Sequence, residues 1–124
     1  MKSTVDKTIL VADDNPECAD ALAQLLRMYD YEVFVAYDGL EAVEMAIEDH
    51  PDVAIVDITL PKLNGFSVAR RLRASAGMAS SQLIAITGWS AEDVADAAGQ
   101  AGFGSFFVKP IDPVQLLSAI ECGN

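Results

Sequence analysis

Five short apolar segments alternate with five helical patterns, and this alternation limits the chain to few folds. The apolar segments, rich in β-branched and aromatic residues, are 8–12, 32–36, 53–57, 82–87 and 105–109. Each is followed by apolar residues at helical spacing. Short connections and right-handed crossovers then favour one parallel sheet with helices on both faces. The sequence therefore predicts an α/β fold, a doubly wound five-stranded parallel sheet.

Start and stop signals bound the helical patterns. Asn15 with Pro16 opens the first, and the capping-box pattern from Asp38 to Glu41 opens the second. Gly102 closes the fourth, as glycine commonly does after a helix. The expected helices are 15–30, 38–49, 65–74, 90–102 and 112–121.

Composition narrows the class of protein. The chain has 124 residues, 52% of them apolar, which suits a single domain over 1–124. Its 8 Lys and Arg against 19 Asp and Glu give a net charge of −11, so nucleic acids and anionic membranes should repel it. No apolar run approaches the roughly 18 residues of a spanning helix, and the N-terminus lacks a signal-peptide pattern. We expect a soluble, cytoplasmic protein with no nucleic-acid or membrane partner.

Polar residues stand at the carboxyl ends of four expected strands. Asp13 and Asp14 follow the first, and Asp57, Thr87 and Lys109 end the third, fourth and fifth. In parallel sheets these ends meet at one edge, where ligands bind. Adjacent carboxylates repel, so a hard divalent cation such as Mg²⁺ is the expected compensator. A carboxylate can also be a nucleophile that forms an acyl phosphate, whose oxygens an ammonium and a hydroxyl would bind.

Each of these residues also has a structural interpretation. Asp13 beside a helix start is commonly a cap, Thr87 a strand-end residue and Lys109 a surface lysine. Asp57 caps nothing obvious, because the next helix starts well downstream. The joint occurrence at four strand ends favours a functional site.

The same residues carry a resemblance to a known family. Over 9–120 the chain resembles a receiver domain of the response-regulator family of two-component signalling, either stand-alone or the receiver of a hybrid histidine kinase. This resemblance implies a flavodoxin-like (βα)5 fold. The matching motifs are the acid pair Asp13-Asp14, Asp57 with Pro61 and Gly65 in the spacing D-x-x-x-P-x-x-x-G, Thr87 before a small residue, and Lys109-Pro110.

The resemblance implies a phosphorelay role for the acids. Asp57 would accept a phosphoryl group from a phosphohistidine on a histidine kinase or histidine phosphotransfer protein. Mg²⁺ or Mn²⁺ would be bound by Asp14, Asp57 and the backbone carbonyl of Thr59, with Asp13 acting mainly through a water. The protein would catalyse only its own phosphorylation and dephosphorylation, so it is not expected to be an enzyme otherwise.

The resemblance also implies how the change is transmitted. Lys109 would pair with Asp57 and then with the phosphoryl group, and its bond to Pro110 is expected to be cis. Thr87 would move to a phosphoryl oxygen while Phe106 changes rotamer. The surface formed by the fourth helix, fifth strand and fifth helix would then bind a downstream protein target.

Three other classes of protein share a feature with this chain: the alternation of strands and helices, a nucleophilic aspartate, or the receiver motifs. A flavodoxin-like nucleotide or flavin binder needs a Ser/Thr/Gly phosphate cradle where Asp13 and Asp14 stand. A haloacid-dehalogenase-type phosphatase needs a second aspartate where Thr59 stands. A pseudo-receiver would be a constitutive protein-interaction module, and the complete acid set argues against it. The basic cluster 70–73 on the expected third helix is typical of a solvated face.

Two positions influence water access to the phosphoryl group in the family, and here they are Thr59 and Trp89. Neither is an acid or amide that would orient a hydrolytic water, and Trp89 is large enough to cover the group. We therefore predict slow intrinsic dephosphorylation that Trp89→Ala accelerates, measured as loss of the phosphoryl adduct by intact mass. A rate that rises little in this variant would contradict the prediction.

Overall fold

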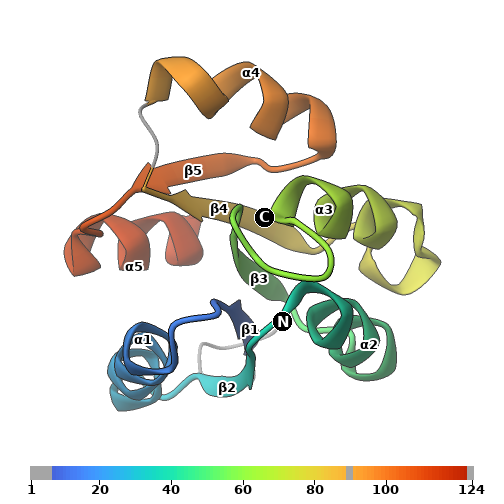
Figure 1. Cartoon of the computed structure of the whole chain (residues 1–124). Helices are drawn as coiled ribbons and strands as arrows, with labels where there is room; N and C mark the ends of the chain where they lie inside the picture. The colour runs from blue at the N-terminus through green and yellow to red at the C-terminus, as the bar shows by residue number, and fades with distance from the viewer. Residues whose placement is uncertain (1–6, 89–90, 123–124) are drawn as a thin grey trace.

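The computed structural model describes residues 7–88 and 91–122, and it contains the predicted alternation of elements (Figure 1). The strands are β1 (Thr8–Ala12), β2 (Glu32–Ala36), β3 (Val53–Asp57), β4 (Gln82–Thr87) and β5 (Ser105–Val108). The helices are α1 (Pro16–Met28), α2 (Gly39–Asp49), α3 (Gly65–Ala74), α4 (Ala91–Ala101) and α5 (Pro113–Cys122), with a short 3₁₀ turn η2 (Ala76–Met78). Within the described residues, no helix is long and apolar enough to cross a membrane.

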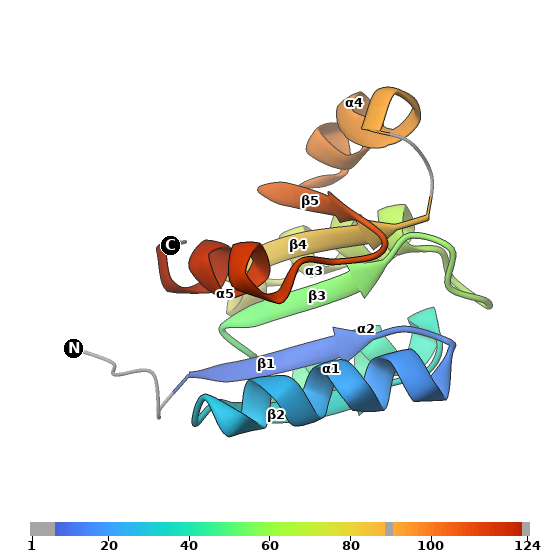
Figure 2. The ribbon, with the colours of Figure 1, turned by 90° about the vertical axis from the view of Figure 1, so that its left-hand side faces the viewer.

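The five strands form one parallel sheet in the order β2-β1-β3-β4-β5, which confirms the predicted fold class. The register places Val11 beside Ile55 and Ile55 beside Ile84 across the centre of the sheet. Figure 2 shows the strands running side by side with their arrowheads at the same edge. Residues at the carboxyl ends of different strands are therefore neighbours in space.

Helices cover both faces of the sheet. Helices α1 and α5 lie against one face, and α2, α3 and α4 lie against the other (Figure 1). The apolar residues of β1, β3 and β4 lie between these two layers and are almost all fully buried. Strands buried on both faces need apolar residues at every position, which explains their continuous apolar runs. Each fully buried leucine or isoleucine contributes roughly 1.5–3 kcal/mol to this packing.

The helix caps follow the sequence signals with small adjustments. Asn15 caps α1 by accepting two backbone amides, and the helix ends at Met28, two residues earlier than predicted. Asp38 Oδ1 accepts the amide of Glu41 at 2.8 Å, as a capping box requires. The carboxylate of Glu41, however, accepts the amide of Tyr37 at 2.8 Å. The return bond of the box therefore reaches one residue before the cap.

The prediction of a solvated basic face on α3 is wrong for Arg73. Its guanidinium donates to the backbone carbonyls of Ser81 at 2.6 Å, Gly102 at 3.0 Å and Ala79 at 3.2 Å. Burial lowers the pKa of Arg73. Gly102 has φ of 118°, and a Cβ there would lie 2.6 Å from Arg73 Cγ. Arg73 thus ties α3 to the end of α4 and to the segment before β4.

The segment after β3 folds back onto the end of that strand. The amide of Gly65, the first residue of α3, donates to the carbonyl of Ile58 at 2.9 Å. A Cβ on Gly65 would lie 2.6 Å from Ile58 Cα and 2.7 Å from the carbonyl oxygen of Asp57. These are backbone atoms, so they have little freedom to move aside. Glycine at this position lets α3 begin directly beside Asp57.

We predict that Gly65→Ala lowers the free energy of unfolding by about 1–3 kcal/mol, since the added methyl group overpacks a site walled by main chain. Gly99→Ala is the matched control. A Cβ at Gly99 would meet no atom within 4 Å, and the position is an exposed one within α4. Replacing a helical glycine there should raise stability by up to about 1 kcal/mol. Urea unfolding of both variants checks the difference, and equal effects at the two positions would contradict it.

Candidate functional site

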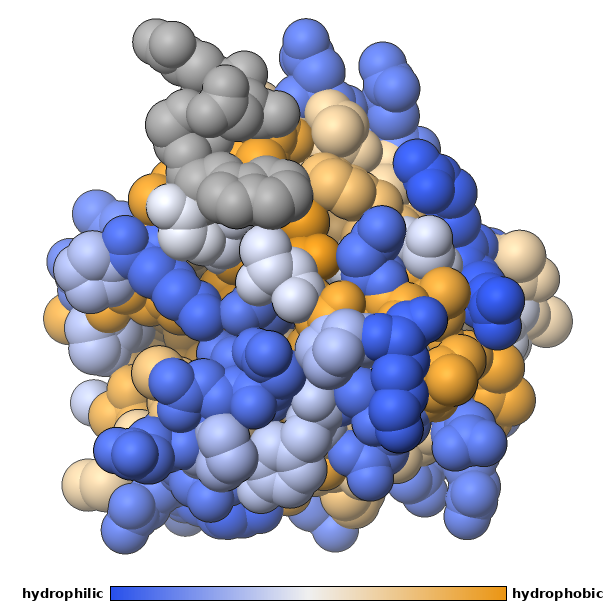
Figure 3. Space-filling model, in the orientation of Figure 1, coloured by the Kyte–Doolittle hydropathy of each residue, from blue (hydrophilic) through white to orange (hydrophobic). Residues whose placement is uncertain are grey.

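The candidate site lies where the carboxyl ends of the strands meet. Strand β1 lies between β2 and β3 in the sheet. The chain therefore adds β2 on one side of β1, and then crosses over to add β3 on the other side. Such a switch in strand order opens a crevice at the strand ends. Figure 3 looks onto this end of the molecule and shows hydrophilic residues gathered over the middle of the face. Among the residues predicted at the strand ends, Asp14 is exposed, whereas Asp13, Asp57 and Thr87 are buried.

Three carboxylates are brought together at this edge. Asp13 and Asp14 directly follow β1, and Asp57 is the last residue of β3. One oxygen from each carboxylate lies within 4.8 Å of the other two. Asp13 and Asp57 are buried while Asp14 is exposed, so the group opens to solvent on one side. Carboxylate oxygens with access to water suit Mg²⁺, which keeps part of its hydration shell, and these residues therefore fit the metal.

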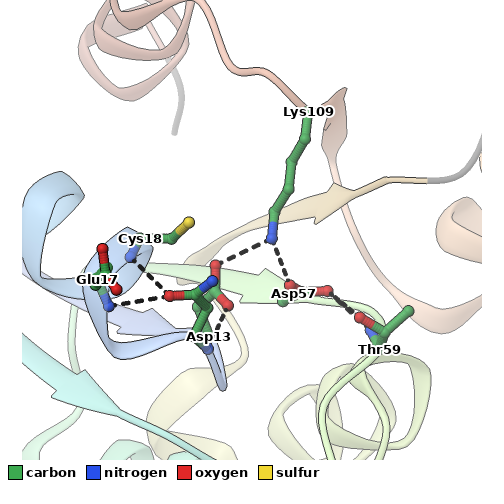
Figure 4. A network of polar contacts seen from close by, with 7 residues as sticks. Asp13, Glu17, Cys18, Asp57, Thr59 and Lys109 are labelled. Carbon is green, nitrogen blue, oxygen red and sulfur yellow. Dashed lines mark hydrogen bonds and ion pairs between the residues drawn. The ribbon is translucent and has the colours of Figure 1, made fainter.

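Lys109 balances part of this negative charge. Its Nζ lies 2.8 Å from Asp57 Oδ2 and 3.2 Å from Asp13 Oδ2 (Figure 4). The bond from Lys109 to Pro110 is cis, as predicted. Burial lowers the pKa of Lys109, but hydrogen bonds and charge attraction from Asp57 and Asp13 outweigh it and hold the pKa above its ordinary value. The ammonium is therefore charged at neutral pH.

The carboxylate of Asp57 also accepts hydrogen bonds from Thr59, two residues further along the chain. Its Oδ1 accepts hydrogen bonds from the backbone amide of Thr59 at 2.9 Å and from the Thr59 hydroxyl at 2.8 Å (Figure 4). Thr59 was predicted to offer its backbone carbonyl and to influence water access, but the contact of its hydroxyl with Asp57 was not predicted. The sequence does contain a signal for this contact. A Ser or Thr two positions after an aspartate can donate its hydroxyl back to that carboxylate in a tight turn.

The two carboxylate oxygens of Asp13 have different partners. Its Oδ1 accepts the amide of Asn15 at 3.0 Å, a local bond at the entry to α1. Its Oδ2 faces Lys109, as Figure 4 shows. The interpretation of Asp13 as the helix cap is wrong, because Asn15 is the N-cap of α1. Asp13 does belong to the acid group.

The remaining predicted residues lie around this group. Thr87, the last residue of β4, is fully buried, and its carbonyl accepts the amide of Lys109 at 2.7 Å. Phe106 lies in β5 and packs, partly buried, against the core layer beneath α2, α3 and α4. Trp89 lies outside the described residues, so its role in water access stays a prediction.

Known proteins resemble this chain along nearly all of its length. A family model for the response regulator receiver domain matches residues 9–121. An uncharacterized 14.6 kDa protein of Leptolyngbya boryana is 29% identical over 98% of this chain and 92% of that protein. The transcriptional regulatory protein PdtaR of Mycobacterium tuberculosis is 32% identical over 96% of this chain and 57% of PdtaR. The DNA-binding response regulator MtrA of Mycolicibacterium smegmatis is 33% identical over 95% of this chain and 50% of MtrA. The chain thus spans about half the length of these two regulators.

Solved structures of receiver domains are also similar to this chain. The receiver domain of a sensor histidine kinase from Pseudomonas aeruginosa, solved with magnesium coordinated in its active-site cleft, superposes with a TM-score of 0.86 at 29% identity, covering 93% of this chain and 94% of that one. A CheY-like receiver domain from Methanospirillum hungatei has a TM-score of 0.86 at 26% identity, covering 93% and 90% of the two chains. With the acid group, the lysine and the sheet order already described, this chain belongs to the response regulator receiver domain family, the phosphoryl-accepting switches of two-component signalling.

Proposed function

We propose that Asp57 is the phosphoryl acceptor of this receiver. The observation that carries the proposal is the position of its carboxylate, buried at the end of β3 between two further carboxylates and the Lys109 ammonium. An Asp57 oxygen attacks phosphorus and forms an O–P bond while the P–N bond to a donor imidazole breaks. The electron pair of that bond goes to the imidazole nitrogen, so the donor leaves as a neutral ring if its other nitrogen carries a proton.

The proposed metal is Mg²⁺ or Mn²⁺, held by Asp14, Asp57 and the backbone carbonyl of Thr59, with Asp13 acting through a water. The close grouping of the three carboxylates supports this ligand set. When bound, the metal would neutralise negative charge on the phosphoryl oxygens. Lys109 is proposed to bind another of those oxygens, since its ammonium already contacts Asp57.

The proposed switch runs through the neighbouring strand ends. Thr87 and Lys109 are joined by a backbone hydrogen bond of 2.7 Å, so the two residues that would bind the phosphoryl group are held in one register. A shift of the Thr87 side chain toward that group would leave space for Phe106 to change rotamer. The affected surface is that of α4, β5 and α5, where a downstream protein target would bind.

A histidine kinase or a histidine phosphotransfer protein is the proposed phosphodonor. An open hollow of about 520 Å³ lies beside Lys109 and Asp13, and its walls come from α1, from β4 and from the segment after β5. Its lining is mainly apolar and includes Leu22, Ile86 and Ile111. An apolar side chain of the donor seated there would bring its histidine next to the acids. We further propose that the protein acts in the cytoplasm and catalyses only its own phosphorylation and dephosphorylation.

The pseudo-receiver alternative is not favoured. A module that only binds partners constitutively would not need a group of carboxylates paired with a charged lysine. Burying charged groups lowers stability, so their presence indicates a function that uses them. Here Asp13, Asp57 and Lys109 lie in contact.

The first experiment is intact-mass analysis after incubation with Mg²⁺ and acetyl phosphate. We expect a single phosphoryl adduct that requires Mg²⁺ and is absent from Asp57→Asn, because the neutral amide oxygen is a far weaker nucleophile than a carboxylate oxygen. Asp49→Asn is the matched control, since Asp49 is an exposed aspartate at the end of α2. An adduct that persists in Asp57→Asn would overturn the assignment of the acceptor.

Lys109→Met separates phosphoryl transfer from metal binding. Loss of the ammonium should slow adduct formation by about 10²–10³-fold, the usual cost of removing one group that stabilises developing charge. The affinity for Mg²⁺ should be unchanged or higher, because a competing cation leaves the carboxylates. Adduct kinetics and an NMR titration with MgCl2 measure the two quantities.

Lys62→Met is the control for this loss of charge. Lys62 Nζ lies 3.4 Å from Asp38, and the lysine side chain is 63% exposed. This variant should retain the wild-type rate. Equal rates for wild type and Lys109→Met, or a large loss of Mg²⁺ affinity in Lys109→Met, would contradict the role given to Lys109.

A further inference from the structure

One face of α2 combines exposed apolar residues with carboxylates. Leu40 and Ile47 are 43% and 47% exposed, and they stand seven residues apart, about two turns along the helix. Residues at this spacing lie above one another on the same side of a helix. Val43, Glu44, Ile47 and Glu48 line an open hollow of about 500 Å³ on this side. We call these five residues the α2 patch, which runs for roughly 10 Å along the helix.

The acids of the α2 patch have no compensating charge within their own helix. Helix α2 contains four acidic residues and no Lys or Arg. Glu44 and Glu48 are four residues apart, a spacing at which like charges on a helix repel. Glu48 and Asp49 stand in the last turn, where the helix dipole favours cations. In the part of the chain that the structure describes, neither Glu44 nor Glu48 forms an ion pair. A cation bound beside these acids would therefore stabilise α2.

Charge decides which occupant fits the α2 patch. The chain carries a net charge of −11, so nucleic acids and anionic membranes would be repelled. A second copy of the chain that docked patch against patch would bring the same acids face to face. A cationic segment of another protein meets the opposite charge. Because the patch follows one helix for two turns, it fits a second helix laid along it, with apolar anchors at i, i+3 or i+4, and i+7.

We propose that the α2 patch binds a cationic amphipathic helix of a partner protein. Apolar side chains of that helix pack against Leu40 and Ile47, and its lysines or arginines lie beside the patch acids. Helix α2 contacts β1 and β2, whereas α4 and β5 lie toward the other edge of the sheet (Figure 1). This partner and the proposed downstream target therefore have separate surfaces. The inference does not depend on the role proposed for Asp57.

The probe for this surface is a synthetic peptide of about 18 residues, long enough to form a helix, with leucines on one face and lysines along both sides of that face. A shuffled peptide of the same composition has the same charge but no apolar face. Each peptide is titrated into ¹⁵N-labelled protein at about 150 mM NaCl, which screens weak charge attraction. The amphipathic peptide should shift the amide signals of α2 and reach half-saturation below about 100 µM, roughly tenfold tighter than the shuffled peptide.

Two matched pairs of variants assign the contacts, and all four positions are exposed, so none should disturb the fold. Ile47→Gln should weaken binding of the amphipathic peptide about tenfold, while Val114→Gln in α5 should leave it unchanged. Glu48→Gln should weaken binding about twofold to fivefold, as expected for one exposed ion pair. Glu32→Gln, at the start of β2, removes the same charge elsewhere and should have no effect.

Three results would overturn the proposal: equal affinity for the two peptides, signal shifts that lie outside α2, or wild-type affinity in Ile47→Gln. Self-association of the protein alone, measured by sedimentation and abolished by Ile47→Gln, would overturn it too, because the occupant would then be a second copy. Asp57→Asn should bind the amphipathic peptide as tightly as wild type, which separates this surface from the phosphoryl site.

Discussion

The contact of one ammonium with two buried carboxylates is the constraint on which the site depends. Asp13 and Asp57 are neighbours because β1 pairs with β3, but Lys109 follows β5, two strands away from β3. The side chain of Lys109 reaches across the end of β4 to make both contacts. The charge balance of the site therefore requires β3, β4 and β5 in their native order, and a change in charge at Asp57 acts directly on the segment after β5.

The elements of the fold could be predicted because their signals are local. A strand covered on both faces is apolar at every position, and β3 and β4 are such strands. The start of α1 was predicted from Asn15 and Pro16, because the capping bonds form within three residues. The order of the strands could not be derived in this way. It depends on which way each crossover turns, and no short segment of the sequence encodes that direction.

The sequence predicted which residues meet at the site, but not the hydrogen bonds that they make. Residues at the carboxyl ends of parallel strands must meet, so Asp13, Asp57 and Lys109 could be named from the sequence. The hydroxyl of Thr59 had a local signal that was not used, since its partner lies two residues away. Arg73 had none, because the carbonyls that it binds lie 6, 8 and 29 residues along the chain. A charge pattern on one helix does not reveal such a partner.

The clamp made by Arg73 has a consequence for how this sequence can vary in evolution. All three of its acceptors are backbone carbonyls, which every amino acid provides. The side chains at Ala79 and Ser81 can therefore be exchanged without loss of those two bonds. Gly102 is different, because its positive φ and the closeness of Arg73 exclude a side chain. We therefore expect substitutions at Ala79 and Ser81 to be tolerated, whereas Arg73 and Gly102 should be retained together.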